Sequence, residues 1–503
     1  MKKVASGYRL IFGYLGIFLI LIGIICLLPL LALPFYPAEA GIADNFYIVG
    51  LASILGGLLL SILLLRGREK ERLGKHQDFV LLVLIWVAAI VIGAIPFLLR
   101  GDMNFTQSVF ESTSGFTSTG LTVFNFDVDP ELGFHVYTLY RSLLIFFGAV
   151  GLVLVLASAL SDRYGMRLYS SEGHNDKLIP NLAKSSRLIL SIYSGIILIG
   201  TVAYMVAGMS FFDAFNHSIT AVGTGGFSTS PNGVLFVGGN AIAIEIISYV
   251  LMLAGATNFV IHLLIIQGKF KKVFRDMELR FMMTLLVMFI PLFIISVYFT
   301  HSSSLGELSF FDSIRLGTFY MISSVTTTGF NSYQPIAFLG PSLVFMSSCL
   351  MMIGGALGST AGGIKQLRVA SVVKGIYYSL ADRISSKRII RPHFFWRYGE
   401  EKEFSNEHYT ESILFFVVYL LVLFVGTIVI TIIPSGVSFG DAFFEVASAV
   451  TGTGLSVGVT FAAQNPAILW ILSIVMFVGR LEIIAVYYAF LRIGRDILRQ
   501  ETV

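Results

Sequence analysis

Long apolar segments alternate with short polar stretches along almost the whole chain. A helix that crosses a bilayer needs about 20 predominantly apolar residues. Ten segments meet this requirement, near residues 8–34, 46–65, 78–99, 136–160, 186–209, 241–267, 280–300, 342–376, 410–433 and 467–493. The pattern predicts an all-α polytopic membrane protein.

A second pattern recurs inside this alternation. Four times a phenylalanine is followed, ten residues later, by the glycine of a Thr-Gly pair, from Phe110, Phe215, Phe319 and Phe444. Each copy begins with about twelve mostly apolar residues, too few to cross a bilayer at roughly 1.5 Å per residue. Four copies in phase predict four covalently linked helix–pore-loop–helix repeats around a pseudo-fourfold pore. We expect an N-terminal transmembrane hairpin at 1–75 and repeats at 76–175, 176–275, 276–400 and 401–503.

The polar half of each copy has the composition of an ion-binding loop. Glycine permits backbone conformations that line up successive carbonyls, and carbonyl rings can replace the hydration shell of potassium. One copy alone would suggest tight packing or an ordinary turn, but four in phase favour a filter. The residues expected to bind K⁺ as a selectivity filter are Thr117, Ser118, Thr119, Gly120, Val222, Gly223, Thr224, Gly225, Thr326, Thr327, Thr328, Gly329, Thr451, Gly452, Thr453 and Gly454.

A glycine-rich run interrupts the apolar segment 342–376. Each glycine destabilises a helix interior by about 1 kcal/mol relative to alanine, so we expect a buried loop at this point. A small-residue surface for helix packing is the alternative. Arg480 lies inside the last apolar segment, where arginine costs roughly 2.5–3.5 kcal/mol and usually has a function. A structural ion pair is its alternative role.

These motifs together resemble the Trk/Ktr/HKT superfamily of potassium transporters, and within it the bacterial Trk-type pore subunits. The likeness covers nearly the whole chain, although no copy has the TVGYG sequence of potassium channels. It implies potassium uptake, one filter glycine per repeat, and a gate in which the glycine-rich loop and the arginine obstruct the pore. The gate residues so implied are Gly354, Gly355, Gly358, Ser359, Thr360, Gly362, Gly363, Lys365 and Arg480.

The distribution of charge orients the chain and indicates its surroundings. Basic residues concentrate at the N-terminus and in segments 66–72, 163–187, 269–280, 365–402 and 492–499. The positive-inside rule therefore places both termini in the cytoplasm of a multi-pass protein. The resemblance implies the bacterial inner membrane, a homodimer, and a cytosolic ring of nucleotide-binding regulatory subunits of the Trk A type. The basic segments 269–280 and 365–402 are suitable docking surfaces for such a ring.

Composition and the remaining motifs exclude other classes. The chain is 56% hydrophobic and 13% charged, far from the roughly 45–50% and 25% of soluble domains. Its formal charge of +4 requires no nucleic-acid partner, and the two cysteines suggest neither disulfides nor a metal site. The sequence has no HExxH and no Walker A motif, so we expect no enzyme and no cofactor beyond transported K⁺. An ion-coupled secondary transporter of another monovalent cation is the alternative.

Several polar residues accompany the four copies. Asp213, Asp312 and Asp441 precede their copies as capping carboxylates would. Glu111 and Glu445 occupy equivalent places, where they either raise the negative potential at the pore mouth or fix neighbouring backbone. The isolated His217 and His262 are expected to be structural.

Overall fold

The computed structural model describes residues 2–66, 73, 76–126, 133–152, 154–155, 182–301, 309–384, 393–404 and 406–501. The chain divides into two compact units, one formed by Met1–Ser191 with Thr460–Val503 and the other by Ile192–Val459. Parts of the expected surface loops, at 67–72, 127–132, 156–181 and 385–392, lie outside the described residues.

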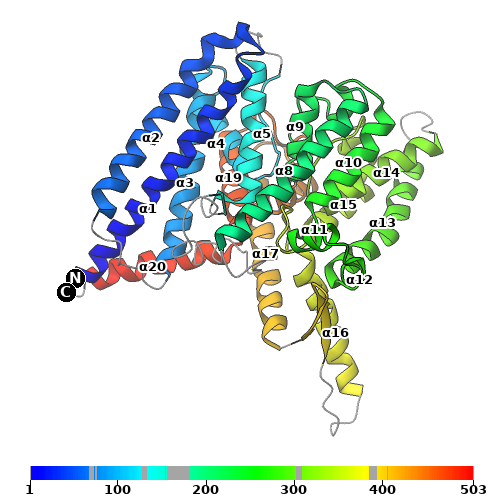
Figure 1. Cartoon of the computed structure of the whole chain (residues 1–503). Helices are drawn as coiled ribbons and strands as arrows, with labels where there is room; N and C mark the ends of the chain where they lie inside the picture. Colours follow the sequence, from blue (N-terminus) through cyan, green and yellow to red (C-terminus); the bar gives the residue numbers. More distant parts are fainter. Residues whose placement is uncertain are drawn as a thin grey trace. The chain divides into compact units, whose positions relative to one another are not determined.

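The first unit is built on a long helical hairpin. Helices α1 (Lys2–Leu27) and α2 (Ala43–Leu65) pack along their length and are joined by the short 3₁₀ helices η1 (Leu28–Ala32) and η2 (Pro37–Ile42) (Figure 1). Helix α3 (Gln77–Leu99), the short α4 (Phe105–Phe116) and α5 (Phe134–Val150) follow. The chain returns to this unit with α19 (Pro466–Arg480) and α20 (Ile484–Glu501). The Tyr8 hydroxyl donates to Asp496 Oδ2 at 3.1 Å, so both ends of the chain lie on the same side of this unit.

The second unit contains most of α8 (Leu182–Val206) and the elements that follow it. In chain order these are α9 (Phe211–Val222), η4 (Val234–Phe236), α10 (Ala241–Gly255), α11 (Phe259–Ile266), α12 (Phe270–Val273), α13 (Met277–His301), α14 (Phe310–Val325), η5 (Ile336–Leu339), α15 (Pro341–Ile353), α16 (Gln366–Ile384), β1 (Phe394–Arg397), β2 (Glu400–Glu403), α17 (Asn406–Ile432) and α18 (Phe439–Thr451). The two strands pair antiparallel, with Phe394 opposite Glu403. This hairpin, where the sequence predicts only a basic polar stretch, lies at the same end of the unit as α16 (Figure 1).

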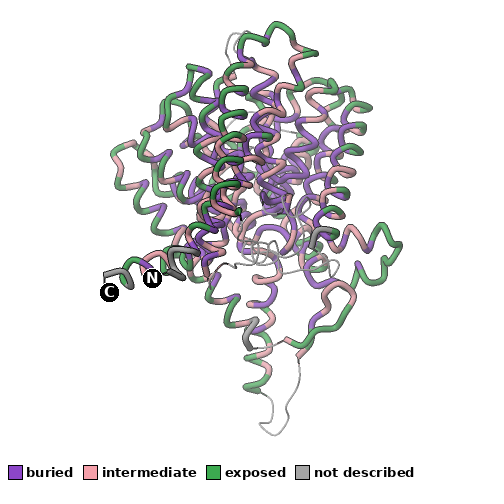
Figure 2. The backbone as a smooth tube through the Cα atoms, turned by 60° about the vertical axis from the view of Figure 1, so that its left-hand side comes forward, coloured by how far each residue is buried: buried purple, intermediate pink, exposed green. Residues whose placement is uncertain are grey.

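The described helices account for the ten expected apolar segments in three ways. Six helices are long and apolar enough to cross a membrane, and two further pairs qualify if each bent pair is one span. The pairs are α10 with α11, bent by 108°, and α19 with α20, bent by 98°. The remaining segments correspond to the shorter helices α5 and α15. Along the long helices buried and exposed residues alternate (Figure 2).

The order of the helices repeats four times. A long helix, a short helix and a second apolar helix recur as α3–α4–α5, α8–α9–α10, α13–α14–α15 and α17–α18–α19. The second apolar helix of one repeat also packs on the short helix of the next, since α10 contacts α14, α15 contacts α18 and α19 contacts α4. A bidentate ion pair joins the first of these contacts, with Arg315 donating to both oxygens of the buried Glu245 at 2.9 Å.

Candidate functional site: the loops that follow the short helices

The short helices are fixed at their starts by side-chain caps. Ser210, Ser309 and Ser438 accept the N–H of an aspartate three residues later, and each hydroxyl donates to that aspartate's carboxylate at 2.6–2.7 Å. Repeat 1 uses Asn104 and Gln107 as a capping box instead. These caps satisfy N–H groups that a helix start leaves without intrahelical partners. Serine is therefore the cap, and the aspartates that the sequence predicts as capping carboxylates are its partners in the first helical turn.

Each short helix ends in a turn of the same geometry. The residue two before the final glycine has a positive φ, at Ser118 (56°), Thr224 (46°), Thr327 (51°) and Gly452 (64°). The next residue donates its backbone N–H to a helix carbonyl five residues earlier, at 2.9–3.0 Å in all four repeats. The following glycine again has a positive φ, at Gly120, Gly226, Gly329 and Gly454. We call the segments 117–120, 223–226, 326–329 and 451–454 the filter loops.

This geometry moves repeat 2 by one residue from the alignment that the sequence predicts. Gly225 donates to the Thr220 carbonyl as Thr119, Thr328 and Thr453 donate in the other repeats. Gly226, not Gly225, therefore occupies the position of the filter glycine, and Val222 is the last residue of α9. The sequence reads Gly-Thr-Gly-Gly at 223–226, so either glycine completes a Thr-Gly pattern within one residue. The spacing from the cap residue would have identified Gly226 in the sequence, because the filter glycine lies 16 residues after each of Asn104, Ser210 and Ser438.

Three filter loops carry a pair of hydroxyl groups that repeat 2 does not have. Thr117 and Thr119 are 2.7 Å apart, Thr326 and Thr328 are 2.9 Å apart, and Thr451 and Thr453 are 2.7 Å apart, measured between Oγ1 atoms. The equivalent residues of repeat 2 are Gly223 and Gly225. The loop of repeat 2 therefore lacks the hydroxyl pair that ties the other three loops to themselves.

The loops of repeats 2, 3 and 4 lie side by side in the second unit. A Cβ atom added to Gly226 would overlap the Thr328 carbonyl oxygen, and one added to Gly329 would overlap the Thr453 carbonyl oxygen. Positive φ and close backbone approach thus both require glycine at these positions.

The glycine-rich segment of repeat 3 is a loop, as predicted. Helix α15 ends at Ile353 and α16 begins at Gln366, so residues 354–365 break what the hydropathy suggests as one span. We call residues 354–365 the glycine-rich loop. Thr360 Oγ1 lies 2.8 Å from the Val222 carbonyl and 2.9 Å from that of Gly255. Gly362 N–H donates to Thr327 Oγ1 at 2.7 Å. The loop is therefore bonded to the base of the filter loops in repeats 2 and 3.

The other side of the glycine-rich loop is bonded to a second network. Glu278, on α13, accepts the Leu357 N–H at 2.6 Å. Asn258, at the break between α10 and α11, donates through Nδ2 to the Leu357 carbonyl and, at 2.7 Å, to the hydroxyl of Tyr398 in the turn of the β-hairpin. The Tyr398 N–H in turn donates to Asp276 at 3.0 Å. Burial raises the pKa of the Asp276 carboxyl, while three backbone N–H groups oppose that rise. Sequence reasoning did not identify Asn258 or Tyr398.

Arg480 is the last residue of α19, at the 98° bend, and not inside a continuous helix as the hydropathy predicts. Its Nη2 donates to the carbonyls of Gly148 and, at 3.0 Å, Ala149. These carbonyls end α5, where the helix dipole is negative. The guanidinium also lies 5.9 Å from the ring centroid of Trp86.

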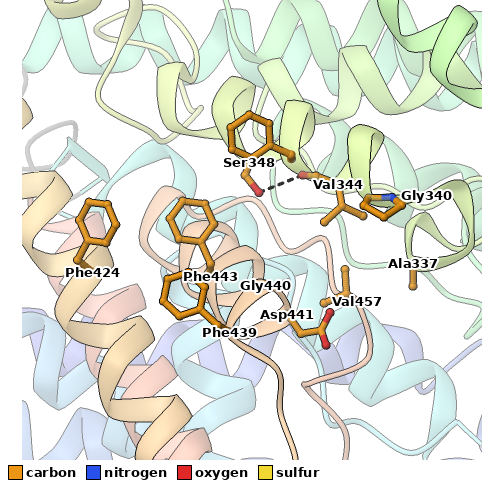
Figure 3. Close-up of a pocket in the computed structure, with 12 residues that line it drawn as sticks. Ala337, Gly340, Val344, Ser348, Phe424, Phe439, Gly440, Asp441, Phe443 and Val457 are labelled. Atoms are coloured by element: carbon orange, nitrogen blue, oxygen red, sulfur yellow. Dashed lines mark hydrogen bonds between the residues drawn. The ribbon is translucent and has the colours of Figure 1, made fainter.

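A separate apolar pocket of about 560 Å³ lies beside the start of α18 (Figure 3). Phe424, Phe439 and Phe443 line one side, and Val344 and Ser348 of α15 line the other. Its carboxylate, Asp441, is held by the Ser438 cap, and the Ser348 hydroxyl donates to the Val344 carbonyl. The polar groups drawn in this pocket are therefore already bonded within the protein.

Long apolar helices separated by short capped helices with Ser/Thr/Gly turns define a class of polytopic membrane transport proteins. Among the described residues, no group of three or more His, Cys, Asp or Glu side chains could hold a metal ion. The chemistry of the site is thus that of backbone carbonyls and hydroxyls.

Comparison with known proteins gives the family. The profile of TrkH, described as a cation transport protein, matches residues 46–495. The Trk system potassium uptake protein TrkH of Salmonella typhimurium is 30% identical over 499 residues, which are 96% of this chain and 98% of that protein. An uncharacterized cation transporter of Methanocaldococcus jannaschii is 29% identical over 496 residues, with 97% and 96% covered. The crystal structure of the potassium transporter TrkH from Vibrio parahaemolyticus aligns with a TM-score of 0.81 at 26% identity, covering 95% of this chain and 98% of that one.

The chain therefore belongs to the TrkH family of cation transport proteins. It is a multi-pass, Trk-type potassium transporter pore subunit, as the sequence motifs predicted, and not an enzyme.

Proposed function

We propose that this chain conducts potassium into the cell through a pore lined by the four filter loops, with the glycine-rich loop and Arg480 as its gate. The observation that carries the proposal is the identical turn in all four repeats, with its αL residue, its N–H returned to the helix and its final glycine. Because these N–H groups bond to the helix and the paired threonine hydroxyls bond to each other, the loop leaves its backbone carbonyls to meet an ion. Carbonyl oxygens in a ring suit a dehydrated potassium ion.

The packing order of the repeats supports a ring of loops. The second apolar helix of a repeat contacts the short helix of the next repeat in three cases, α10 with α14, α15 with α18 and α19 with α4. These contacts link repeat 2 to 3, repeat 3 to 4 and repeat 4 to 1. Repeat 4 thereby reaches repeat 1 inside the first unit, where Gln107 Nε2 donates to the Ala462 carbonyl at 2.7 Å. On this proposal the chain consists of an N-terminal hairpin at 1–75 and four repeats at 76–175, 176–275, 276–400 and 401–503.

The gate assignment rests on position and charge. Hydrogen bonds from Thr360 and Gly362 hold the glycine-rich loop against the base of the filter loops, where it would obstruct a permeating ion. A fixed positive charge near a narrow passage repels a cation by several kcal/mol at an effective dielectric near 20. Arg480 would supply that charge, with its donors oriented by the end of α5.

The proposed assembly is a homodimer in the bacterial inner membrane, with both termini cytoplasmic, on a nucleotide-binding ring of the Trk A type. Relatives are named as parts of a Trk system, which supports partner subunits. Mass measurement of the detergent-solubilised chain tests the dimer.

Flux measurements on the purified chain in liposomes test the function. We expect uptake of K⁺ and Rb⁺ to exceed that of Na⁺ and Li⁺, and uptake to follow the potassium gradient. Equal uptake of all four ions would contradict the filter, and uptake that requires a proton or sodium gradient would replace the pore with a coupled transporter.

A further inference from the structure

The corrected register reveals a position that the four repeats share behind the filter. Nine residues before each filter glycine lie Glu111, His217, Tyr320 and Glu445. All four side chains are fully buried. Sequence reasoning set His217 apart as an isolated structural residue, and the structure places it at this shared position. We call these four the clamp residues.

Each clamp residue bonds to the chain just beyond its own filter glycine. Glu111 accepts the Thr122 hydroxyl at 2.9 Å and the Val123 N–H at 3.0 Å. Glu445 accepts the Ser456 hydroxyl at 2.8 Å and the Val457 N–H at 3.3 Å. The two carboxylates therefore make the same pair of contacts, two and three residues after Gly120 and Gly454.

The neutral clamp residues reach the same two places with different chemistry. His217 Nε2 lies 3.0 Å from the Ser228 hydroxyl, two residues after Gly226. Its Nδ1 lies 2.8 Å from the Asp213 carbonyl, which can only accept, so Nδ1 carries a proton. The Tyr320 hydroxyl accepts the Ser332 N–H at 3.3 Å, three residues after Gly329, and donates to the Gln334 carbonyl at 2.5 Å.

A second hydrogen bond extends three of the clamps in the same way. Thr122, Ser228 and Ser456 each accept, through their hydroxyl, the N–H two residues further along, at 3.0 Å. Each filter loop is thus fixed at both ends. The helix carbonyls hold its start, and the clamp residue holds its exit.

The carboxylates could instead attract cations to the pore mouth, but the geometry around Glu111 argues against this. Arg141, itself almost fully buried, donates from Nε to Glu111 at 2.7 Å and from Nη2 to the Thr122 hydroxyl at 3.0 Å. The charge of the carboxylate is balanced by Arg141, and its oxygens already accept three donors, the Thr122 hydroxyl, the Val123 N–H and Arg141 Nε.

We propose that Glu111, His217, Tyr320 and Glu445 are positioning residues that fix the exit of each filter loop and thereby contribute to the preference for potassium over sodium. The proposal rests on the proposed filter. A loop whose exit can move would tolerate the closer carbonyl approach that the smaller sodium ion requires. Carboxylate clamps make charge-assisted hydrogen bonds, which are roughly twice as strong as neutral ones.

Substitutions at Glu445 separate positioning from charge. Glu445→Gln removes the charge but keeps an oxygen acceptor, whereas Glu445→Met removes both at similar length. We expect Glu445→Gln, which keeps an acceptor for one of the two contacts, to lower the potassium-to-sodium permeability ratio less than Glu445→Met does. Glu445→Met removes both contacts and should lower the ratio by at least about two- to tenfold, the range that a single lost hydrogen bond corresponds to. An equal loss in both variants would overturn the positioning role in favour of charge.

Repeat 3 provides a test that changes no charge. Tyr320→Phe deletes only the clamp hydroxyl, and we expect the permeability ratio to fall while potassium flux continues. Tyr333→Phe is the matched control, because that hydroxyl bonds to Asp312 at 3.3 Å and not to the filter exit. Reversal potentials under bi-ionic conditions, measured with the reconstituted full chain, give the ratio.

The outcomes distinguish the two proposals. A selective unaltered chain with unchanged ratios in both Tyr320→Phe and Glu445→Met overturns the clamp alone. An unaltered chain that shows no preference for potassium overturns the proposed filter first. A lowered ratio in Tyr320→Phe and not in Tyr333→Phe supports the clamp.

Discussion

The filter loops and the glycine-rich loop are both irregular, buried and rich in glycine, yet the bonds that hold them differ. Each filter loop bonds mainly to its own short helix and its own clamp residue, all within about 20 residues of sequence. The glycine-rich loop bonds to Val222, Gly255, Glu278 and Thr327 on other elements. Locally bonded backbone keeps its shape when neighbouring helices shift, whereas backbone bonded to several elements is released when they move. This difference is what a fixed filter and a movable gate require.

The largest expected effect comes from breaking the close approach inside the filter. Gly226→Ser would place a Cβ against the Thr328 carbonyl at a backbone φ of 63°. We expect loss of potassium preference by more than about tenfold or loss of conduction, since strain of this kind costs roughly 1–3 kcal/mol. Reconstituted flux and reversal potentials measure it.

Gly225→Thr is the matched control for this position, because threonine is the residue that the other three repeats carry there. We expect it to conduct and to remain selective. If Gly225→Thr is damaging and Gly226→Ser is silent, the one-residue correction of repeat 2 is wrong.

The sequence predicts best those features that depend on local interactions, and it predicts less well those that depend on contacts between distant residues. The spans, the four short helices, the aspartates at three of them and the break at 354–365 could be predicted because each depends on local hydropathy, capping chemistry or glycine content. The register of repeat 2 was misassigned because Gly225 and Gly226 offer two local solutions, and only the spacing from the Ser210 cap distinguishes them in the sequence. Asn258 and Tyr398 were missed because their bonds join residues far apart in sequence. The bend at Arg480 was missed because the apolar pattern continues across it.

The next effect concerns the charge of the gate. Arg480→Ala should raise basal potassium flux by about tenfold or more, because a repulsion of several kcal/mol is removed. The potassium-to-sodium ratio should persist, since the filter loops are untouched. Tracer uptake into liposomes, with thermal unfolding as a check on folding, measures both.

Arg480→Lys sharpens this result. Lysine keeps the positive charge but loses the planar fork that donates to Gly148 and Ala149. If the charge forms the barrier, Arg480→Lys keeps flux low. Flux as high as in Arg480→Ala would show that anchoring to the end of α5 matters instead.

A smaller effect is expected from loosening the glycine-rich loop where it meets the filter. Thr360→Val is nearly isosteric and deletes the hydroxyl that bonds to the Val222 and Gly255 carbonyls. Leaving such groups unpaired costs about 1–3 kcal/mol, so the held position should weaken and basal flux should rise about fivefold to tenfold. Thr257→Val is the control, because its hydroxyl donates to the Leu253 carbonyl of the preceding helix α10 and not to a carbonyl at the base of a filter loop. Equal flux in the two variants would contradict a holding role for Thr360.

The smallest expected effect tests whether the β1–β2 hairpin takes part in holding the same loop. Asn258 links the Tyr398 hydroxyl to the Leu357 carbonyl, so the hairpin and the glycine-rich loop share one side-chain amide. Tyr398→Phe removes one of the two acceptors of that amide. The Asn258 side chain is then held less firmly against the Leu357 carbonyl, so basal flux should increase about twofold to threefold. Tyr378→Phe, on α16 beside the hairpin, is the control, since its hydroxyl lies 3.5 Å from the Phe394 carbonyl and its ring stacks on His393. If Tyr398→Phe behaves like this control while Thr360→Val raises flux, the loop is held from the filter side alone, and movement of the hairpin would not reach the gate through Asn258.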